Sequence, residues 1–177
     1  MISADKIASQ LADQDDNIKK QISKTFSEEV YLKSGLLDRK KVAKIVFQKD
    51  SLRKKLNAIV HPQVFRAIDS QVQKLSPAQR SPYVIIEAAL IYETGMDRRL
   101  NFTIVVDAGA ESRIERVMAR DGSSRKDVLD RMRSQMSVEK KLQEADFVIG
   151  NERSKSELLP KVKLIDSLLT HLAKTKT

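Results

Sequence analysis

The sequence contains no cysteine and no tryptophan, and only five glycines and four prolines among its 177 residues. The lack of cysteine excludes disulfide bonds and thiolate metal ligands, which agrees with a cytoplasmic protein. The two histidines, His61 and His171, are too few and too separated for a histidine-rich metal site, and we assign no metal ligands from the sequence. No apolar run approaches the roughly 18 residues of a membrane span, and no signal-peptide pattern opens the chain.

Basic residues outnumber acidic ones by 33 to 24, which gives a net charge of +9. Such an excess favours either a polyanionic ligand, such as a nucleotide, a coenzyme or a nucleic acid, or a basic surface that is merely solvated. The five Phe and three Tyr residues show no stacking pattern and no nucleic-acid motif is present. We therefore expect a small-molecule ligand and no nucleic-acid or membrane partner, and the sequence does not predict an oligomeric state.

Continuous apolar runs at 83–86, 102–106 and 147–149 are typical of strands buried on both faces of a parallel sheet. Segments with helical patterns follow them, at 110–120, 124–135, 137–144 and 154–173. The alternation of strands and helices predicts an α/β fold with a parallel sheet in three layers. The length fits a single domain over 1–177.

Residues 13–75 lack strand signals and predict a helical sub-domain inserted into the α/β fold. We expect a helix at 4–12, a polar and mixed stretch at 13–37, and a helix through 41–47 whose N-cap is Asp38. A further helix begins near Ser51 and should break or restart at Pro62, because proline has no backbone donor. A loop is expected at 76–82.

Acidic and amide side chains follow the predicted strands. Ligands of open α/β sheets bind beyond the carboxyl ends of the strands, where Asp5, Glu87, Asp107 and Asn151 are expected. A carboxylate at this edge can accept a proton from a hydroxyl group or hold a magnesium ion. Asp107 is equally well placed to cap the helix that follows it.

Six arginines occur within about twenty residues, where the pattern predicts two helices joined by a short turn. They are Arg113, Arg116, Arg120, Arg125, Arg131 and Arg133. Guanidinium groups suit phosphate binding, but an i,i+4 pair such as Asp127 and Arg131 equally indicates a solvated helix face. His61, with Arg39 upstream, is either structural or a hydrogen-bond donor to a bound anion.

Seven short motifs follow one another along the chain. They are ISAD at 2–5, GLLDR at 35–39, LNAIVHP at 56–62, EAALIYE at 87–93, VMARD at 117–121, RMRSQM at 131–136 and ADFVIGN at 145–151. Together they resemble the motifs of the dephospho-coenzyme A (dephospho-CoA) kinase family, over nearly the whole chain. Three positions depart from that family: Ser3 stands for an aspartate, Glu87 for an aspartate and Ala89 for a proline.

The resemblance implies a P-loop kinase fold with a helical coenzyme A-binding sub-domain at 13–75 and a lid at 110–140. It implies transfer of the γ-phosphoryl group of ATP, with Mg²⁺, to the ribose 3′-hydroxyl of dephospho-CoA. Asp5 matches the catalytic base, and Arg120 and Arg131 match lid arginines that offset charge on the transferring group. The implied substrate-binding residues are Arg39, His61 and Glu87, and Asn151 falls near the adenine pocket.

A phosphate-binding loop with a Gly-Lys pair is expected in this family, in a strand–loop–helix unit of about thirty residues. None of the five glycines is followed by lysine, so that unit is absent from the sequence given. Two hypotheses follow. Either a complete kinase has been shortened by a late start, and the chain as given is inactive, or the protein is a P-loop-less relative that binds coenzyme A or a nucleotide without catalysis.

Overall fold

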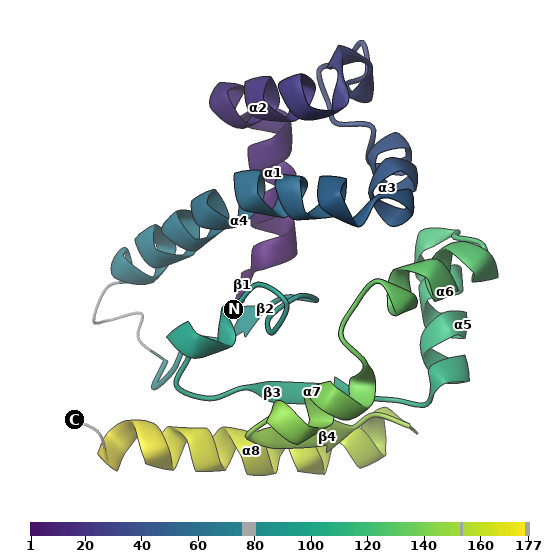
Figure 1. Ribbon diagram of the computed structural model, residues 1–177. Coiled ribbons are helices and arrows are strands. Elements are labelled where there is room, and N and C mark those ends of the chain that lie inside the picture. Colours follow the sequence, from purple (N-terminus) through teal and green to yellow (C-terminus); the bar gives the residue numbers. More distant parts are fainter. Residues whose placement is uncertain (76–80, 153, 176–177) are drawn as a thin grey trace. The chain divides into compact units, whose positions relative to one another are not determined.

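The computed structural model describes residues 1–75, 81–152 and 154–175. Of the loop expected at 76–82, residues 76–80 lie outside the described residues. The chain divides into two compact units, Met1–Ala89 and Leu90–Thr177, whose elements are labelled in Figure 1. Each unit carries one pair of parallel strands, as the apolar runs predict.

Over residues 1–75 and 81–89, unit 1 combines one short strand pair with four α-helices. Its elements are β1 (Ile2–Ser3), α1 (Ala4–Gln14), α2 (Asp16–Phe26), a 3-10 turn (Glu28–Val30), α3 (Arg39–Gln48), α4 (Asp50–Gln73) and β2 (Ile86–Glu87). β1 and β2 are parallel, with Ile2 opposite Ile86 and Ser3 opposite Glu87. The helices pack on α4, which contacts α1, α2 and α3.

The stretch 13–37, expected to be polar and mixed, contains a complete helix, α2. Two isoleucines one helical turn apart, Ile18 and Ile22, are fully buried and anchor it to the core. The Asp15 carboxylate caps it by accepting hydrogen bonds from the N–H groups of Asn17 and Ile18, both at 2.9 Å. Ile18, Ile22 and Phe26 recur every fourth residue behind this cap, so the sequence does carry a helical pattern here, and tertiary burial supplies most of the stability of the helix.

The predicted break at Pro62 is wrong, because α4 runs through it from Asp50 to Gln73. An interior proline removes one backbone hydrogen bond and costs about 3 kcal/mol. The buried stripe of Val60, Val64 and Ile68 flanks the proline and packs on neighbouring helices, which offsets that cost. The predicted cap of the preceding helix is confirmed, since Asp38 accepts a hydrogen bond from the N–H of Lys41 at 3.0 Å.

Unit 2 contains a second parallel pair and the helices expected from the sequence. Its elements are a 3-10 turn (Asp97–Arg99), β3 (Ile104–Asp107), α5 (Ala110–Asp121), α6 (Arg125–Arg133), α7 (Val138–Glu144), β4 (Phe147–Gly150) and α8 (Lys155–Thr175). β3 pairs with β4 in parallel over four residues, from Ile104 opposite Phe147 to Asp107 opposite Gly150. Throughout the described ranges, no helix combines the length and the apolar character needed to cross a membrane.

The expectation that every strand is buried on both faces is wrong in part. Val106 on β3 and Val148 on β4 are 58% and 50% exposed, whereas Ile149 is buried. Only Ile86 of the run 83–86 lies in a strand. Each sheet holds two strands among the described residues. Strand side chains project from the two faces of a sheet, so the exposure of Val106 and Val148 means that no packed layer fully covers them.

Candidate functional site

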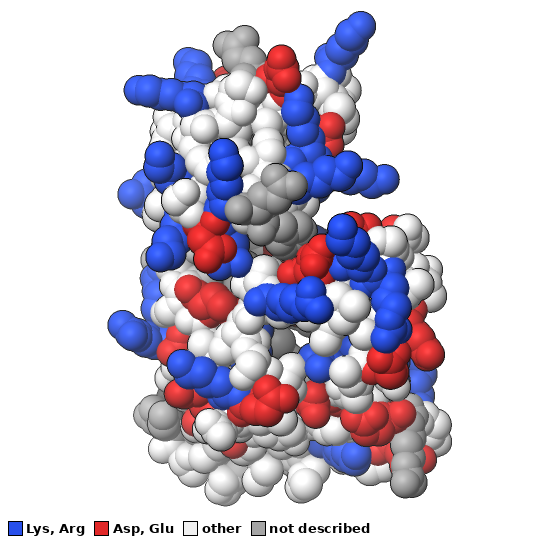
Figure 2. Space-filling view, turned by 45° about the vertical axis from the view of Figure 1, so that its right-hand side comes forward, with Lys and Arg blue, Asp and Glu red and all other residues white. Residues whose placement is uncertain are grey.

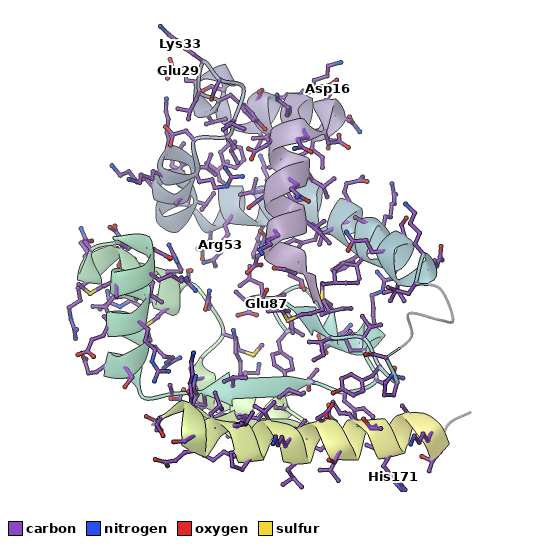
Figure 3. The ribbon with its side chains drawn as sticks, turned by 180° about the vertical axis from the view of Figure 1, so that it is seen from behind. Asp16, Glu29, Lys33, Arg53, Glu87 and His171 are labelled. Carbon is purple, nitrogen blue, oxygen red and sulfur yellow. The ribbon has the colours of Figure 1, made fainter. Side chains whose placement is uncertain are left out.

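Two carboxylates lie together at the end of the strand pair in unit 1. Asp5 is in the first turn of α1, directly after β1, and Glu87 ends β2. Figure 3 labels Glu87 at this position. Because β1 and β2 are parallel and Ser3 lies opposite Glu87, both acids fall at the same end of the pair.

The surroundings of Asp5 make its carboxyl group a better proton acceptor. Burial raises the pKa of the Asp5 carboxyl, and the negative charge of Glu87 raises it further, against the lowering effect of a hydrogen bond from the backbone of Ala89. Ser3, which stands where the family has an aspartate, donates a hydrogen bond from its Oγ to Glu87 Oε2 at 2.7 Å. Ser3 therefore orients Glu87 without adding a third negative charge.

Arg39 is tied to α1 through an aspartate that the sequence analysis did not single out. Arg39 Nη2 lies 2.6 Å from Asp13 Oδ2 and donates to the Ser9 carbonyl at 3.1 Å. Asp13 Oδ1 also accepts the backbone N–H of Leu37 at 2.9 Å. Burial works to raise the pKa of Asp13, but the Arg39 hydrogen bond and the Leu37 N–H outweigh it and lower the pKa. Asp13 thus fixes the start of α3 and the Arg39 side chain together.

His61 lies on α4, in the same unit as Asp5 and Arg39. Burial lowers the pKa of its imidazole, so the ring is held in the neutral form. The ring stacks on Phe65, with centroids 6.4 Å apart and planes inclined by 23°. A neutral imidazole can donate one hydrogen bond to a ligand, as expected, while its packing on Phe65 also gives it a structural role.

In unit 2, the two arginines expected in the lid bind the same carboxylate, that of Asp121. Asp121 is the last residue of α5, and its carboxylate accepts from Arg120 Nε at 2.6 Å and Arg120 Nη2 at 3.0 Å. Arg131, on α6, reaches the same carboxylate with Nη1 at 3.4 Å. The hydrogen bond from Arg120 is the main cause of a lowered pKa at Asp121, followed by the contribution of Arg131. The structure therefore brings Arg120 and Arg131 together through a residue to which the sequence analysis gave no role.

A different arginine of this segment makes an ordinary surface ion pair. Arg125 binds Glu111 with two hydrogen bonds, at 2.7 and 2.8 Å, and both side chains are exposed. On the face shown in Figure 2, basic and acidic side chains are interspersed. This supports the alternative that part of the net charge is simply solvated.

Asn151 follows β4 and is fixed through its backbone. Its N–H donates to the carbonyl of Asp107 at 2.6 Å, and its own carbonyl accepts from Arg116 Nη2 at 3.0 Å. The N-cap of α5 is Gly109, without a side-chain hydrogen bond, so Asp107 does not cap that helix. Asp107 and Asn151 therefore lie side by side at the end of the second strand pair.

Glu93 is a further residue that the sequence analysis quoted only as part of a motif. Its Oε1 lies 2.9 Å from Lys141 Nζ and accepts the backbone N–H of Met136 at 2.7 Å. The side chains of Glu93 and Lys141 are only 18% and 16% exposed. Its Oε2 is buried without a hydrogen-bond partner in the described part of the chain. Glu93 thus anchors the linker between α6 and α7. Its role could not be predicted from a local sequence pattern, because its partners are distant in the sequence.

Comparisons with known proteins identify the family of this chain. The family model described as dephospho-CoA kinase matches residues 1–157. A dephospho-CoA kinase of Thermus thermophilus is 37% identical over 159 residues, covering 90% of this chain and 75% of the relative. The enzyme of the same name from Arabidopsis thaliana is 32% identical over 158 residues, covering 89% and 68%.

Solved structures agree with the sequence relatives. A crystal structure of a protein from Thermus thermophilus matches with a TM-score of 0.77 and 34% identity, covering 95% of this chain and 83% of the other. The dephospho-CoA kinase from Campylobacter jejuni matches with a TM-score of 0.63 and 31% identity, covering 99% and 86%. The predicted P-loop kinase fold is confirmed, and the chain belongs to the dephospho-CoA kinase family, a family of phosphotransferases.

Proposed function

We propose that this chain carries the substrate-binding, phosphoryl-transfer and lid residues of a dephospho-CoA kinase. The reaction moves the γ-phosphoryl group of ATP to the ribose 3′-hydroxyl of dephospho-CoA. The observation that carries the proposal is the pair Asp5 and Glu87 at the end of two parallel strands, in a chain of this family. Phosphoryl transfer needs positioning and charge stabilisation more than covalent catalysis. This pair supplies a base for the attacking hydroxyl group, and the arginines of unit 2 supply positive charge.

Asp5 is proposed as the general base. The 3′-hydroxyl oxygen attacks the γ-phosphorus, the bond from that phosphorus to the bridging oxygen of ADP breaks, and the hydroxyl proton passes to the Asp5 carboxylate. Burial is the largest cause of the raised pKa of Asp5, and it favours Asp5 as a proton acceptor whether or not Glu87 binds a cation. A positioned base contributes about 10² to 10⁴ in rate.

Glu87 is proposed to contribute to substrate binding beside Asp5, with its Oε2 held by the hydrogen bond from Ser3. Mg²⁺ prefers oxygen ligands and is commonly held by one or two carboxylates together with substrate phosphates. The described residues contain no cluster of three or more acidic or histidine ligands. A magnesium ion here would therefore be held by Glu87 together with the phosphates of ATP, to which it would supply positive charge.

Further residues are proposed to bind the two substrates. Arg39 and His61 bind the coenzyme, Arg39 as a cation held by Asp13 and His61 as a neutral donor. Arg120 and Arg131 offset the negative charge that develops on the transferring group. Asn151 borders the adenine of ATP.

We also propose that the 177 residues alone have little or no kinase activity. None of the five glycines precedes a lysine, so this polypeptide has no Gly-Lys-Ser/Thr cradle for the β- and γ-phosphates. A fusion that places the family's strand–glycine loop–helix segment before Met1 should restore transfer. The assay measures coenzyme A formed from ATP and dephospho-CoA, for the 177-residue chain and for the fusion.

The decisive variant in the active fusion is D5N, which should lower kcat by about a hundredfold or more because the base is lost. Asp16, an exposed acid of α2 labelled in Figure 3, provides the control D16N, which should leave kcat unchanged. A fusion that binds coenzyme A tightly but never forms product would instead support a non-catalytic binding protein. Full activity of D5N would remove Asp5 from the mechanism.

A further inference from the structure

Asp121 is the meeting point of two arginines that come from different helices. Arg120 precedes it at the end of α5, and Arg131 lies ten positions later on α6. The Asp121 carboxylate uses two of the five N–H donors of Arg120 and one of those of Arg131. The other donors of each guanidinium group are not used by Asp121.

The carboxylate lies deeper than the cations that it binds. Its side chain is 28% exposed, whereas those of Arg120 and Arg131 are 71% and 45% exposed. Both arginine side chains are therefore more exposed to solvent than the carboxylate that they share.

The connection between the helices fixes this arrangement locally. Gly122 ends α5 in the left-handed conformation, with φ +63°. Ser124 and Asp127 then form a reciprocal capping box at the start of α6, with Ser124 Oγ 2.6 Å from Asp127 Oδ2. A left-handed glycine and a capping box define the turn, and the ion pair from Asp121 to Arg131 closes it.

We propose that Asp121 is a positioning residue for phosphate binding, which holds Arg120 and Arg131 together so that both guanidinium groups contact one phosphate chain. The inference rests on the proposed function of the lid. Two like charges on separate helices repel each other, and two long side chains lose rotamer freedom when an anion orders them. A carboxylate between them offsets the repulsion and orders the side chains before the phosphate arrives.

A matched pair of variants isolates the positioning effect. D121N and E111Q each remove one negative charge from the α5–α6 segment, and both acids bind arginine in the same pair of helices. Only D121N removes the carboxylate that the two lid arginines share. Any general electrostatic gain in anion binding is therefore common to both variants.

The measurement is a titration of the 15N-labelled chain with inorganic triphosphate, followed through the arginine Nε–Hε resonances. In the parent chain and in E111Q, the Arg120 and Arg131 signals should shift together with one dissociation constant. In D121N we expect that constant to be about three- to tenfold larger than in E111Q, which corresponds to ordering one or two arginine side chains. D121E, which restores the carboxylate, should recover most of the affinity.

Equal or tighter binding by D121N than by E111Q would overturn the proposal, as would arginine signals in the parent chain that do not respond to triphosphate. Circular dichroism of each variant confirms that it is folded before the titration. Because the titration needs no turnover, a chain without kinase activity can still show the Asp121 effect. Failure of the proposed reaction and failure of this inference are thus distinguishable.

Discussion

Arg39 in unit 1 and the arginine pair in unit 2 are each held by an aspartate, but the two aspartates have different surroundings. The Asp13 side chain is 15% exposed and also accepts a backbone N–H from Leu37. The described contacts of the Asp121 carboxylate are all with arginine side chains, at the surface. The first aspartate belongs to the fold as well as to the site, whereas the second mainly places two cations. We therefore expect the Asp13 ion pair to serve stability, and we propose that the Asp121 ion pairs serve ligand binding.

The largest effect on stability is expected at Glu93, which extends the comparison to a largely buried ion pair in unit 2. E93A leaves Lys141 without this partner and the Met136 N–H without its acceptor. Breaking a buried pair from one side costs about 3 kcal/mol of unfolding free energy. Urea denaturation followed by circular dichroism measures the loss, and E111A, at an exposed ion pair, is the control. Equal losses in the two variants would contradict the role of burial.

A smaller loss is expected at Asp13, the fold-forming member of the comparison. D13A removes both the Arg39 contact and the acceptor for Leu37, and should lower the unfolding free energy by about 2 kcal/mol. D13N keeps an oxygen for Leu37 and should lose about half as much. The same urea experiment tests both, with D16N as the exposed control. A loss in D13N as large as that in D13A would mean that charge, and not the backbone bond, dominates.

His61 connects the stability of unit 1 to pH. Burial lowers the pKa of His61 below its ordinary value of 6.5. Between the lowered pKa and 6.5 the unfolded chain binds a proton that the folded chain does not, so stability falls as pH falls through this window and is fully present above it.

The slope of unfolding free energy against pH, measured from pH 7.5 to 5.5, should therefore be smaller in H61Q than in the parent chain. H171Q replaces an exposed histidine of α8, labelled in Figure 3, and serves as the matched control. An identical slope in H61Q and the parent chain would show that His61 does not titrate differently in the folded state.

Local patterns predicted much of this fold because the relevant signals were local. The helices of unit 2 and the Asp38 cap follow from apolar periodicity and capping residues. The continuity of α4 through Pro62 depends instead on burial against distant segments, which no local window contains. The exposure of Val106 depends on which segments pack on that face of β3, and a run of apolar residues does not specify them.

For the candidate site, sequence motifs indicated the residues that we propose contact the substrates, but not the residues that hold them in place. Asp5, Glu87, Arg120 and Arg131 were predicted from the motifs, and the structure pairs them as two clusters. Asp13 lies 26 residues from Arg39 in sequence, and Glu93 lies 43 residues from Met136. Such supporting contacts have no fixed spacing in the sequence, so only the three-dimensional structure reveals them.

The smallest effect on stability, and the sharpest test of the comparison, is expected at Asp121. D121N breaks ion pairs among exposed side chains, and exposed pairs contribute little to folding because water already solvates both partners. Its urea midpoint should therefore match that of the parent chain, whereas D13N should unfold at lower urea. Triphosphate affinity should separate D121N from E111Q even though stability does not. If D121N lowered the urea midpoint as much as D13N does, Asp121 would belong to the fold in the same way as Asp13, and the distinction between the two aspartates would fail.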